Sequence, residues 1–238
     1  MTPPDPRLEA AVAASRSWYD DVMELHGVPV SVADGLWVAG GPVPLFHSSV
    51  LALRPGIDAH AAAEASRARR RGGLPGGGVA DCFADLELAG HGFEELLEAK
   101  WIHRTAPEPG LAEEWTELND ARDLDRWSEL HDYVGVLPEA ALRHPRFRIL
   151  GRFADGRLIG GAVTHQPPSG DVVGVSNVWE RPGTDPDWLG LLAAIGRSHP
   201  GRAIVGYERD ADLARALAVG FEIVGTHRVW VPAPFAPA

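Results

Sequence analysis

The sequence has few of the features that would indicate secretion or membrane insertion. It contains a single cysteine, Cys82, among 238 residues. An internal disulfide is therefore excluded, and we expect a cytoplasmic protein in which Cys82 is a buried thiol. No apolar run approaches the roughly 18 residues of a membrane-spanning helix. The N-terminus has neither a basic start nor an apolar core, so we expect no signal peptide.

Positive charge is also scarce. Lysine and arginine number 22 against 33 acidic residues, which gives a formal net charge of −11. Nucleic acids and anionic membranes attract proteins with a positive field, so we exclude both as partners. The basic cluster at Arg67 and Arg69–Arg71 falls late in an expected helix, where it complements the helix dipole. The ten histidines show no spacing suited to a metal, and we predict no metal site.

The pattern of apolar residues predicts a mixed α+β sheet. The expected helices cover 7–26, 58–71, 123–131, 138–143, 186–197 and 210–218. The expected strands cover 28–32, 35–39, 47–54, 78–84, 91–104, 171–179, 202–207 and 221–231, with a β-hairpin over 146–166 that turns at Asp155-Gly156.

Two short motifs occur twice in the same order. "RPGID" begins at Arg54 and "RPGTD" at Arg181, each between an expected strand and an expected helix. "GFE" occurs at Gly92 and again at Gly220, each time near the start of a late strand. We therefore predict a diverged tandem duplication. Because "TAPEPGLAEE" has the composition of a linker, we expect a degenerate N-terminal half over 1–110 and a C-terminal domain over 111–238.

The second half resembles the GCN5-related N-acetyltransferase (GNAT) superfamily. The resemblance lies in the hairpin, in "DVVGVSNVWERP" and in "DLARALAVGFEIVGTHRVWV". It covers roughly 115–232 and extends faintly over 35–104, so the chain resembles a tandem GNAT protein with a truncated first copy. This resemblance implies a fold that binds acetyl-CoA or another acyl-CoA in a V between two splayed parallel strands. It also implies transfer of the acyl group to an amine, here expected to be a small molecule.

The resemblance also implies a loop, Arg/Gln-Gly-x-Gly-x-Gly/Ala, that wraps the CoA pyrophosphate. In this sequence Asp185-Pro186-Asp187-Trp188-Leu189-Gly190 takes its place, and only Gly190 matches. Asp185 replaces a cation by an anion, and Pro186 removes an N–H donor. The alternative is that Asp185 caps the following helix with Pro186 at its first position, as Asp58 would do in the first half. We predict this capped start and weak or absent binding of acyl-CoA.

Six residues are candidates for the site. The resemblance implies a tyrosine in the last helix that acts as the general acid, but Ala216 occupies that position in this sequence. Tyr207 and Glu208, at the end of one expected strand, are therefore the candidate catalytic residues. The candidate cofactor contacts are Asn177, Val178 and Trp179, where a backbone N–H could polarise a thioester carbonyl, and Gly190.

Two functions remain open at this stage, and each site residue also has a structural alternative. The first function is an acyl-CoA-dependent N-acyltransferase acting on a small amine. The second is a catalytically inactive binding or regulatory protein that has lost CoA, and different chemistry in the same cleft is a third possibility. Tyr207 would then be an ordinary core aromatic residue, and Asn177 and Glu208 would be polar residues at strand ends.

Overall fold

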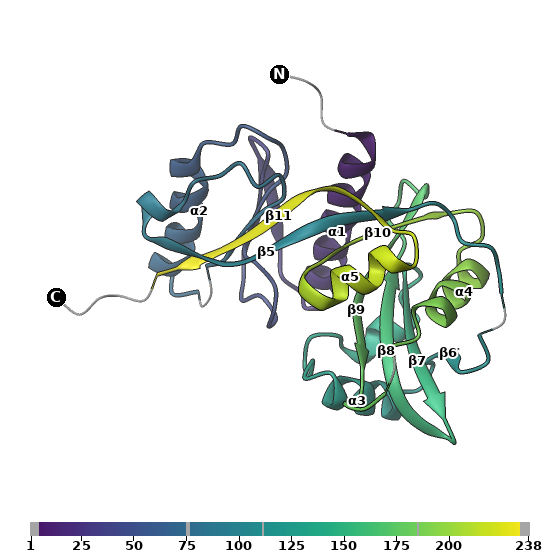
Figure 1. Cartoon of the computed structure of the whole chain (residues 1–238). Helices are drawn as coiled ribbons and strands as arrows, with labels where there is room; N and C mark the ends of the chain where they lie inside the picture. Colours follow the sequence, from purple (N-terminus) through teal and green to yellow (C-terminus); the bar gives the residue numbers. More distant parts are fainter. Residues whose placement is uncertain (1–4, 75–76, 111, 185, 234–238) are drawn as a thin grey trace. The chain divides into compact units, whose positions relative to one another are not determined.

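The computed structural model describes residues 5–74, 77–110, 112–184 and 186–233 (Figure 1). The helices are α1 (Pro6–Leu25), α2 (Ala59–Arg71), α3 (Ala121–Leu130), α4 (Trp188–Ser198) and α5 (Asp210–Ala218), with 3₁₀ helices η1 (Ala89–His91) and η2 (Glu139–Arg143). The strands are β1 (Val30–Ala33), β2 (Leu36–Ala39), β3 (Val50–Ala52), β4 (Val79–Asp81), β5 (Phe93–Arg104), β6 (Trp115–Glu117), β7 (Phe147–Ala154), β8 (Arg157–His165), β9 (Val172–Glu180), β10 (Ala203–Glu208) and β11 (Glu222–Pro232). Within the described residues, no helix combines the length and the apolar character that a membrane span requires.

The chain divides into two compact units that do not follow its order. Unit 1 consists of Met1–Trp18 and Trp101–Val224, and unit 2 consists of Tyr19–Lys100 and Gly225–Ala238. The helix α1 and the strands β5 and β11 each pass from one unit to the other. The last strand of the chain, β11, thus lies mostly in unit 2, and the boundary at 110/111 stays a prediction about the repeats.

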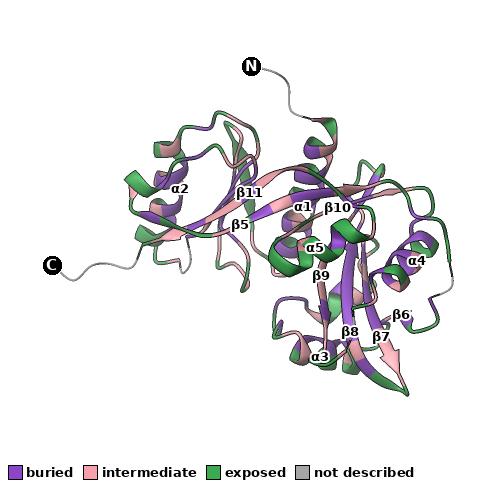
Figure 2. Cartoon of the chain, in the orientation of Figure 1, coloured by how far each residue is buried: buried purple, intermediate pink, exposed green. Residues whose placement is uncertain are grey.

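Unit 1 contains strands in the order β5-β10-β9-β8-β7-β6. The β7–β8 hairpin turns at Asp155-Gly156, as predicted, with φ values of 49° and 70°. Positive φ at both central residues is the requirement of a type I′ turn. Most of β7 and β8 is buried, whereas α5 buries only Ala216 (Figure 2).

The core of unit 1 lies between its sheet and α4. Leu191 and Ile195, one helical turn apart on α4, are fully buried against β9 and β10. The sheet contributes Val173 and Ile204 from its two parallel strands. This apolar contact places the N-terminus of α4 beside the end of β9, where the "RPGTD" motif lies.

Unit 2 contains strands in the order β1-β2-β3-β4-β11-β5. The strand β11 joins β4 antiparallel, with Val229 opposite Ala80. Arg228 of β11 makes an ion pair with the fully buried Asp81 of β4, at 3.2 Å. The last strand of the chain therefore completes a unit that is otherwise built from the first half.

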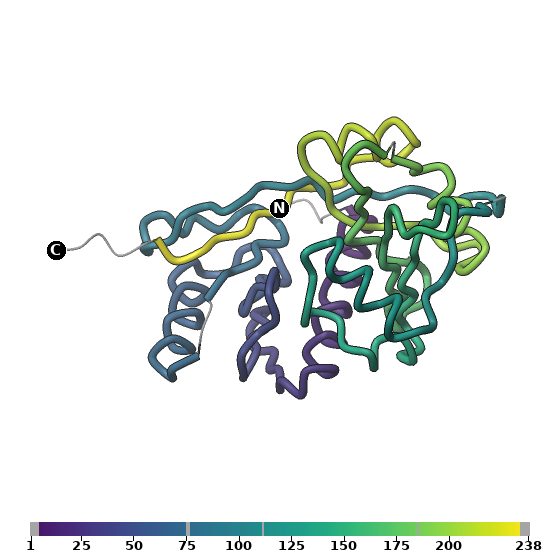
Figure 3. The backbone as a smooth tube through the Cα atoms, turned by 90° about the horizontal axis from the view of Figure 1, so that it is seen from below, coloured from purple at the N-terminus to yellow at the C-terminus, as the bar shows by residue number. Residues whose placement is uncertain are grey.

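The two repeats have matching structures, and their paths can be followed in Figure 3. In each, a strand, a helix and a parallel strand follow one another, with Val50 opposite Val79 in β3–β4 and Val172 opposite Ala203 in β9–β10. The glycine of each Arg-Pro-Gly motif has a positive φ, 70° in the first repeat and 82° in the second. The similar contexts support the predicted duplication. The first copy is shorter because η1 replaces the counterpart of α5.

Three sequence-based predictions about these elements were wrong. The predicted helix over 138–143 is the 3₁₀ helix η2. The short strand β6, which begins directly after the predicted linker, was not predicted. The strand predicted over 78–84 ends at Asp81, because a turn follows in which Ala84 has a φ of 54°.

Candidate functional site

Two neighbouring parallel strands in unit 1 pair over only part of their length. The ladder between β9 and β10 runs from Val172–Ala203 to Gly174–Val205. Beyond these positions β9 continues to Glu180 and β10 continues to Glu208, but the two strands no longer pair with each other. At Gly206 a Cβ atom would lie 2.7 Å from the carbonyl oxygen of Val175, so glycine permits the last close approach. The arrangement is a V that opens toward the carboxyl ends of the strands.

A β-bulge interrupts β9 inside this V. Trp179 pairs with Gly161 and Ser176 pairs with Val163, so Asn177 and Val178 both oppose a single residue of β8. Asn177 has a φ of 53°, a left-handed conformation that asparagine adopts more readily than most residues. A bulge removes an extra residue from the ladder and re-aims its backbone groups. The bulge thus places one more residue on β9 than on β8 at this point of the ladder.

The side chain of Asn177 is held by His131, which follows α3. The Asn177 Oδ1 atom lies 3.2 Å from His131 Nε2, and its Nδ2 donates to Ser176 Oγ at 3.0 Å. The imidazole stacks on Trp179, with ring centroids 5.8 Å apart and an angle of 15°. Burial lowers the pKa of His131, which keeps the ring neutral near pH 7. The neutral ring and the amide fix the conformation of the bulge.

The sequence analysis missed His131 and its aromatic neighbour Trp127. Trp127 packs edge-on against both His131 and Trp179, at 5.0 and 5.9 Å. Gly161 of β8 makes room for it, because a Cβ atom there would lie 2.0 Å from the indole nitrogen. His131 and Asn177 are 46 residues apart, and no spacing rule relates them. The only feature of the sequence that could have indicated this contact is the group of aromatic and histidine residues near the end of α3.

The three consecutive candidates in β9 have different environments. Asn177 contacts His131, and Trp179 packs among the aromatic rings beside α3. Val178 packs instead against the core that α4 covers. Only Asn177 and Trp179 are therefore brought together through their side chains.

The candidates in β10 lie at its exposed end. Tyr207 is 42% exposed, and its ring meets Trp101 edge-on at 5.4 Å. Glu208 is partly buried, and this burial, with a smaller contribution from Asp212, raises its pKa from 4.5 to about 7. A carboxyl group with such a pKa can accept or donate a proton near neutral pH. It is the one candidate of the six whose protonation equilibrium lies close to neutrality in this structure.

The helix α4 begins later than expected. The predicted cap, Asp185, lies outside the described residues, and the residue that caps α4 is Asp187. Its Oδ1 accepts a hydrogen bond from the Gly190 N–H at 2.9 Å. A Cβ atom on Gly190 would lie 2.0 Å from the other carboxylate oxygen, so this glycine makes room for the cap. Pro186 precedes the helix and is not its first residue, because Asp187 provides the capping side chain.

A second carboxylate completes the polar network at this turn. Glu180 Oε1 accepts from the Asp187 N–H at 3.4 Å and from Arg152 Nη1 at 3.2 Å. Burial raises the pKa of Glu180, and the charge of Arg152 opposes that shift. Trp115 donates its indole N–H to Asp187 at 3.0 Å. Two acidic side chains thus accept from backbone N–H groups of the kind that bind phosphate at a helix start.

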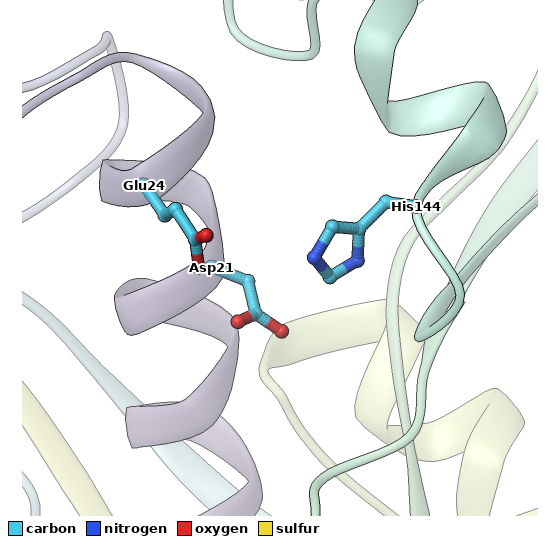
Figure 4. A group of neighbouring side chains, drawn as sticks. All are labelled: Asp21, Glu24 and His144. Atoms are coloured by element: carbon cyan, nitrogen blue, oxygen red, sulfur yellow. The ribbon is translucent and has the colours of Figure 1, made fainter.

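Figure 4 shows a group of possible metal-ligating side chains, Asp21, Glu24 and His144. Asp21 and Glu24 lie one turn apart on α1 in unit 2, whereas His144 follows η2 in unit 1. The three side chains therefore do not form a site within either unit.

Comparisons with known proteins relate the fold to acetyltransferases. No protein-family model matches the sequence, and no curated protein sequence matches it. A GCN5-related N-acetyltransferase from Kribbella flavida superposes with a TM-score of 0.62 at 16% identity, over 94% of this chain and 96% of the other. A putative acetyltransferase of the GNAT family from Novosphingobium aromaticivorans gives 0.57 at 14% identity, over 95% and 97%. A tandem GNAT protein from the clavulanic acid biosynthesis pathway gives 0.53 at 14% identity, over 84% and 79%.

These similarities show the fold and confirm the predicted resemblance. The chain has the mixed α+β GNAT fold, and its neighbours include a tandem member. The V between β9 and β10 and the bulge at Asn177 lie in the part of the chain that carried the resemblance in the sequence.

Proposed function

We propose that this protein is an acyl-CoA-dependent N-acyltransferase that acts on a small amine in the V of unit 1. The observation that carries the proposal is the short parallel ladder of β9 and β10 with a bulge at Asn177 in its longer arm. The shared fold of the compared acetyltransferases supports it. The single cysteine, Cys82, supports a cytoplasmic location.

The residues of the V suit proton transfer and carbonyl polarisation. A backbone N–H group at the bulge, near Asn177 and Val178, would donate to the carbonyl oxygen of the thioester. Glu208, with a pKa of about 7, can take the proton from an amine before it attacks. Tyr207 is exposed and can donate a proton to a leaving group. Acyl-CoA, when bound, would supply the acyl group as a reactive thioester.

A second function is favoured by the N-terminus of α4. Asp187 and Glu180 occupy donors of this turn and place negative charge beside it. Their repulsion of phosphate and the loss of donors oppose CoA binding. The alternative is therefore a binding or regulatory protein that has kept the GNAT fold and lost the cofactor.

Calorimetric titration with acetyl-CoA, followed by a thiol-release assay with a panel of small amines, separates the two functions. The acidic turn before α4 predicts weak binding, with a Kd above ~100 μM or less than about 5.5 kcal/mol of binding free energy. A micromolar Kd would contradict this effect of the turn and favour the acyltransferase, which requires acyl-CoA. The acyltransferase also predicts turnover that Glu208→Gln abolishes. Absence of both binding and turnover across the panel would support the binding protein instead.

A further inference from the structure

A surface pocket of about 390 Å³ lies in unit 1, at the turn of the β7–β8 hairpin. Its lining includes Asp123, Arg126, Phe153, Arg157, Leu158 and Arg181. The helix α3 contributes the first two, the hairpin the next three, and the segment after β9 the last. None of these residues belongs to the candidate catalytic group in the V.

The charge of the pocket is opposite to that of the chain. The whole chain has a net charge of −11, whereas the lining contains three arginines and one aspartate. Such a local excess of cations suits a doubly charged anion.

Two of these arginines have no partner among the residues that the structure describes. Within the part of the chain that the structure describes, the side chains of Arg157 and Arg181 make no ion pair or hydrogen bond. Arg126 has a long, exposed contact of 4.0 Å with Glu129. Guanidinium groups bind phosphate through paired hydrogen bonds, so three of them around one pocket can hold a phosphoryl group from several sides.

The hairpin supplies apolar surface beside the three arginines. Leu158 is buried at 7% exposure, and Phe153 is partly buried next to it. Phe153 and Leu158 are paired across the hairpin, so their side chains lie together. Ligand pockets commonly combine such apolar surface with a few charged groups.

We propose that this pocket binds a small organic phosphate, with its phosphoryl group on Arg126, Arg157 and Arg181 and its carbon skeleton against Phe153 and Leu158. The site is independent of the acyltransferase proposed above, because it requires neither acyl-CoA nor Glu208. The site is formed by side chains of α3, of the hairpin and of the segment after β9, and the capped N-terminus of α4 is not part of it.

Isothermal titration without CoA tests the proposal, with phenyl phosphate, inorganic phosphate and malonate compared at constant ionic strength. We expect phenyl phosphate to bind most tightly, since it alone offers both a phosphoryl group and an apolar ring. The double variant Arg157→Gln/Arg181→Gln should weaken this binding at least about tenfold, as expected for hydrogen bonds to charged groups. Arg122→Gln is the matched control, because Arg122 is an exposed arginine of α3 that does not line the pocket. This variant should bind phenyl phosphate like the unchanged protein.

Other outcomes would overturn the proposal. No binding of phenyl phosphate, or equal binding by the double variant, would exclude the arginines as the phosphate site. Tighter binding of malonate than of either phosphate would reject the phosphoryl group as the ligand. Equal losses in Arg122→Gln and the double variant would show a general charge effect and not a pocket.

Discussion

Asp187 accepts a hydrogen bond from the backbone N–H of Gly190, with 2.9 Å between Oδ1 and N. This contact satisfies the start of α4 from within the chain. It uses a donor that phosphate ligands use in other helix-start sites.

Asp187→Asn should tighten acetyl-CoA binding relative to the unchanged protein. Asparagine is as good an N-cap as aspartate, so the helix keeps its cap while the negative charge is removed. Asp187→Ala is the matched variant, and it should lower the free energy of unfolding by about 1 kcal/mol through loss of the cap. Calorimetry and urea denaturation measure the two effects. A micromolar Kd for the unchanged protein would contradict the inhibitory role of Asp187.

Glu208→Gln should change the dependence of stability on pH. Burial raises the pKa of Glu208 to about 7, above its ordinary value of 4.5, so the folded state holds a proton that the unfolded state has released. Its contribution to stability is thus complete below pH 4.5 and is lost as the pH rises through 7. The variant should lose this decline, which falls between pH 4.5 and about 7, in denaturant titrations. An unchanged slope would place the pKa of Glu208 near its ordinary value.

Tyr207→Phe should lower kcat by roughly 10²–10⁴-fold if the proposed acyltransferase uses this hydroxyl as its acid. The ring packs edge-on against Trp101, a contact that phenylalanine preserves, so stability should change little. Steady-state kinetics and a thermal melt give both readouts. Full turnover in the variant would remove Tyr207 from the mechanism.

Asn177→Ala should destabilise the protein by roughly 1–2 kcal/mol. Alanine is strained at a φ of 53°, and the hydrogen-bonding contact with His131 is lost. Asn177→Gly loses the same contact without the strain, so it should be the more stable of the two variants. Chemical denaturation compares them, and equal stability would show that the bulge is not strained.

Arg228→Met should lower the free energy of unfolding by about 3 kcal/mol, because Asp81 would remain fully buried without its charge partner. Since the pair joins β11 to β4, the loss reports on the strand from the second half of the chain that completes unit 2. The double variant Asp81→Asn/Arg228→Met removes both charges and should recover part of the stability. No recovery would mean that packing of Arg228, and not charge pairing, stabilises the strand.

Local chemistry in the sequence was sufficient for much of the fold. Turn residues and the periodicity of apolar residues depend only on positions close together in the sequence. They predicted the Asp155-Gly156 turn, the helix over 210–218 and the strands on either side of each Arg-Pro-Gly motif. The repeated motifs likewise predicted the duplication. The acidic residues before α4 predicted a capped helix, although the capping residue is Asp187.

Only the tertiary structure determined which distant residues meet. His131 reaches Asn177 across 46 residues because α3 packs beside β9, and no local pattern contains that distance. The bulge depends on the register between β8 and β9, and the raised pKa of Glu208 depends on its burial in the folded chain. The place of β11 in unit 2 has the same origin, since β11 pairs with β4 through backbone hydrogen bonds that carry little sequence information. Composition and period determine which elements form, whereas packing and register determine which of their side chains meet.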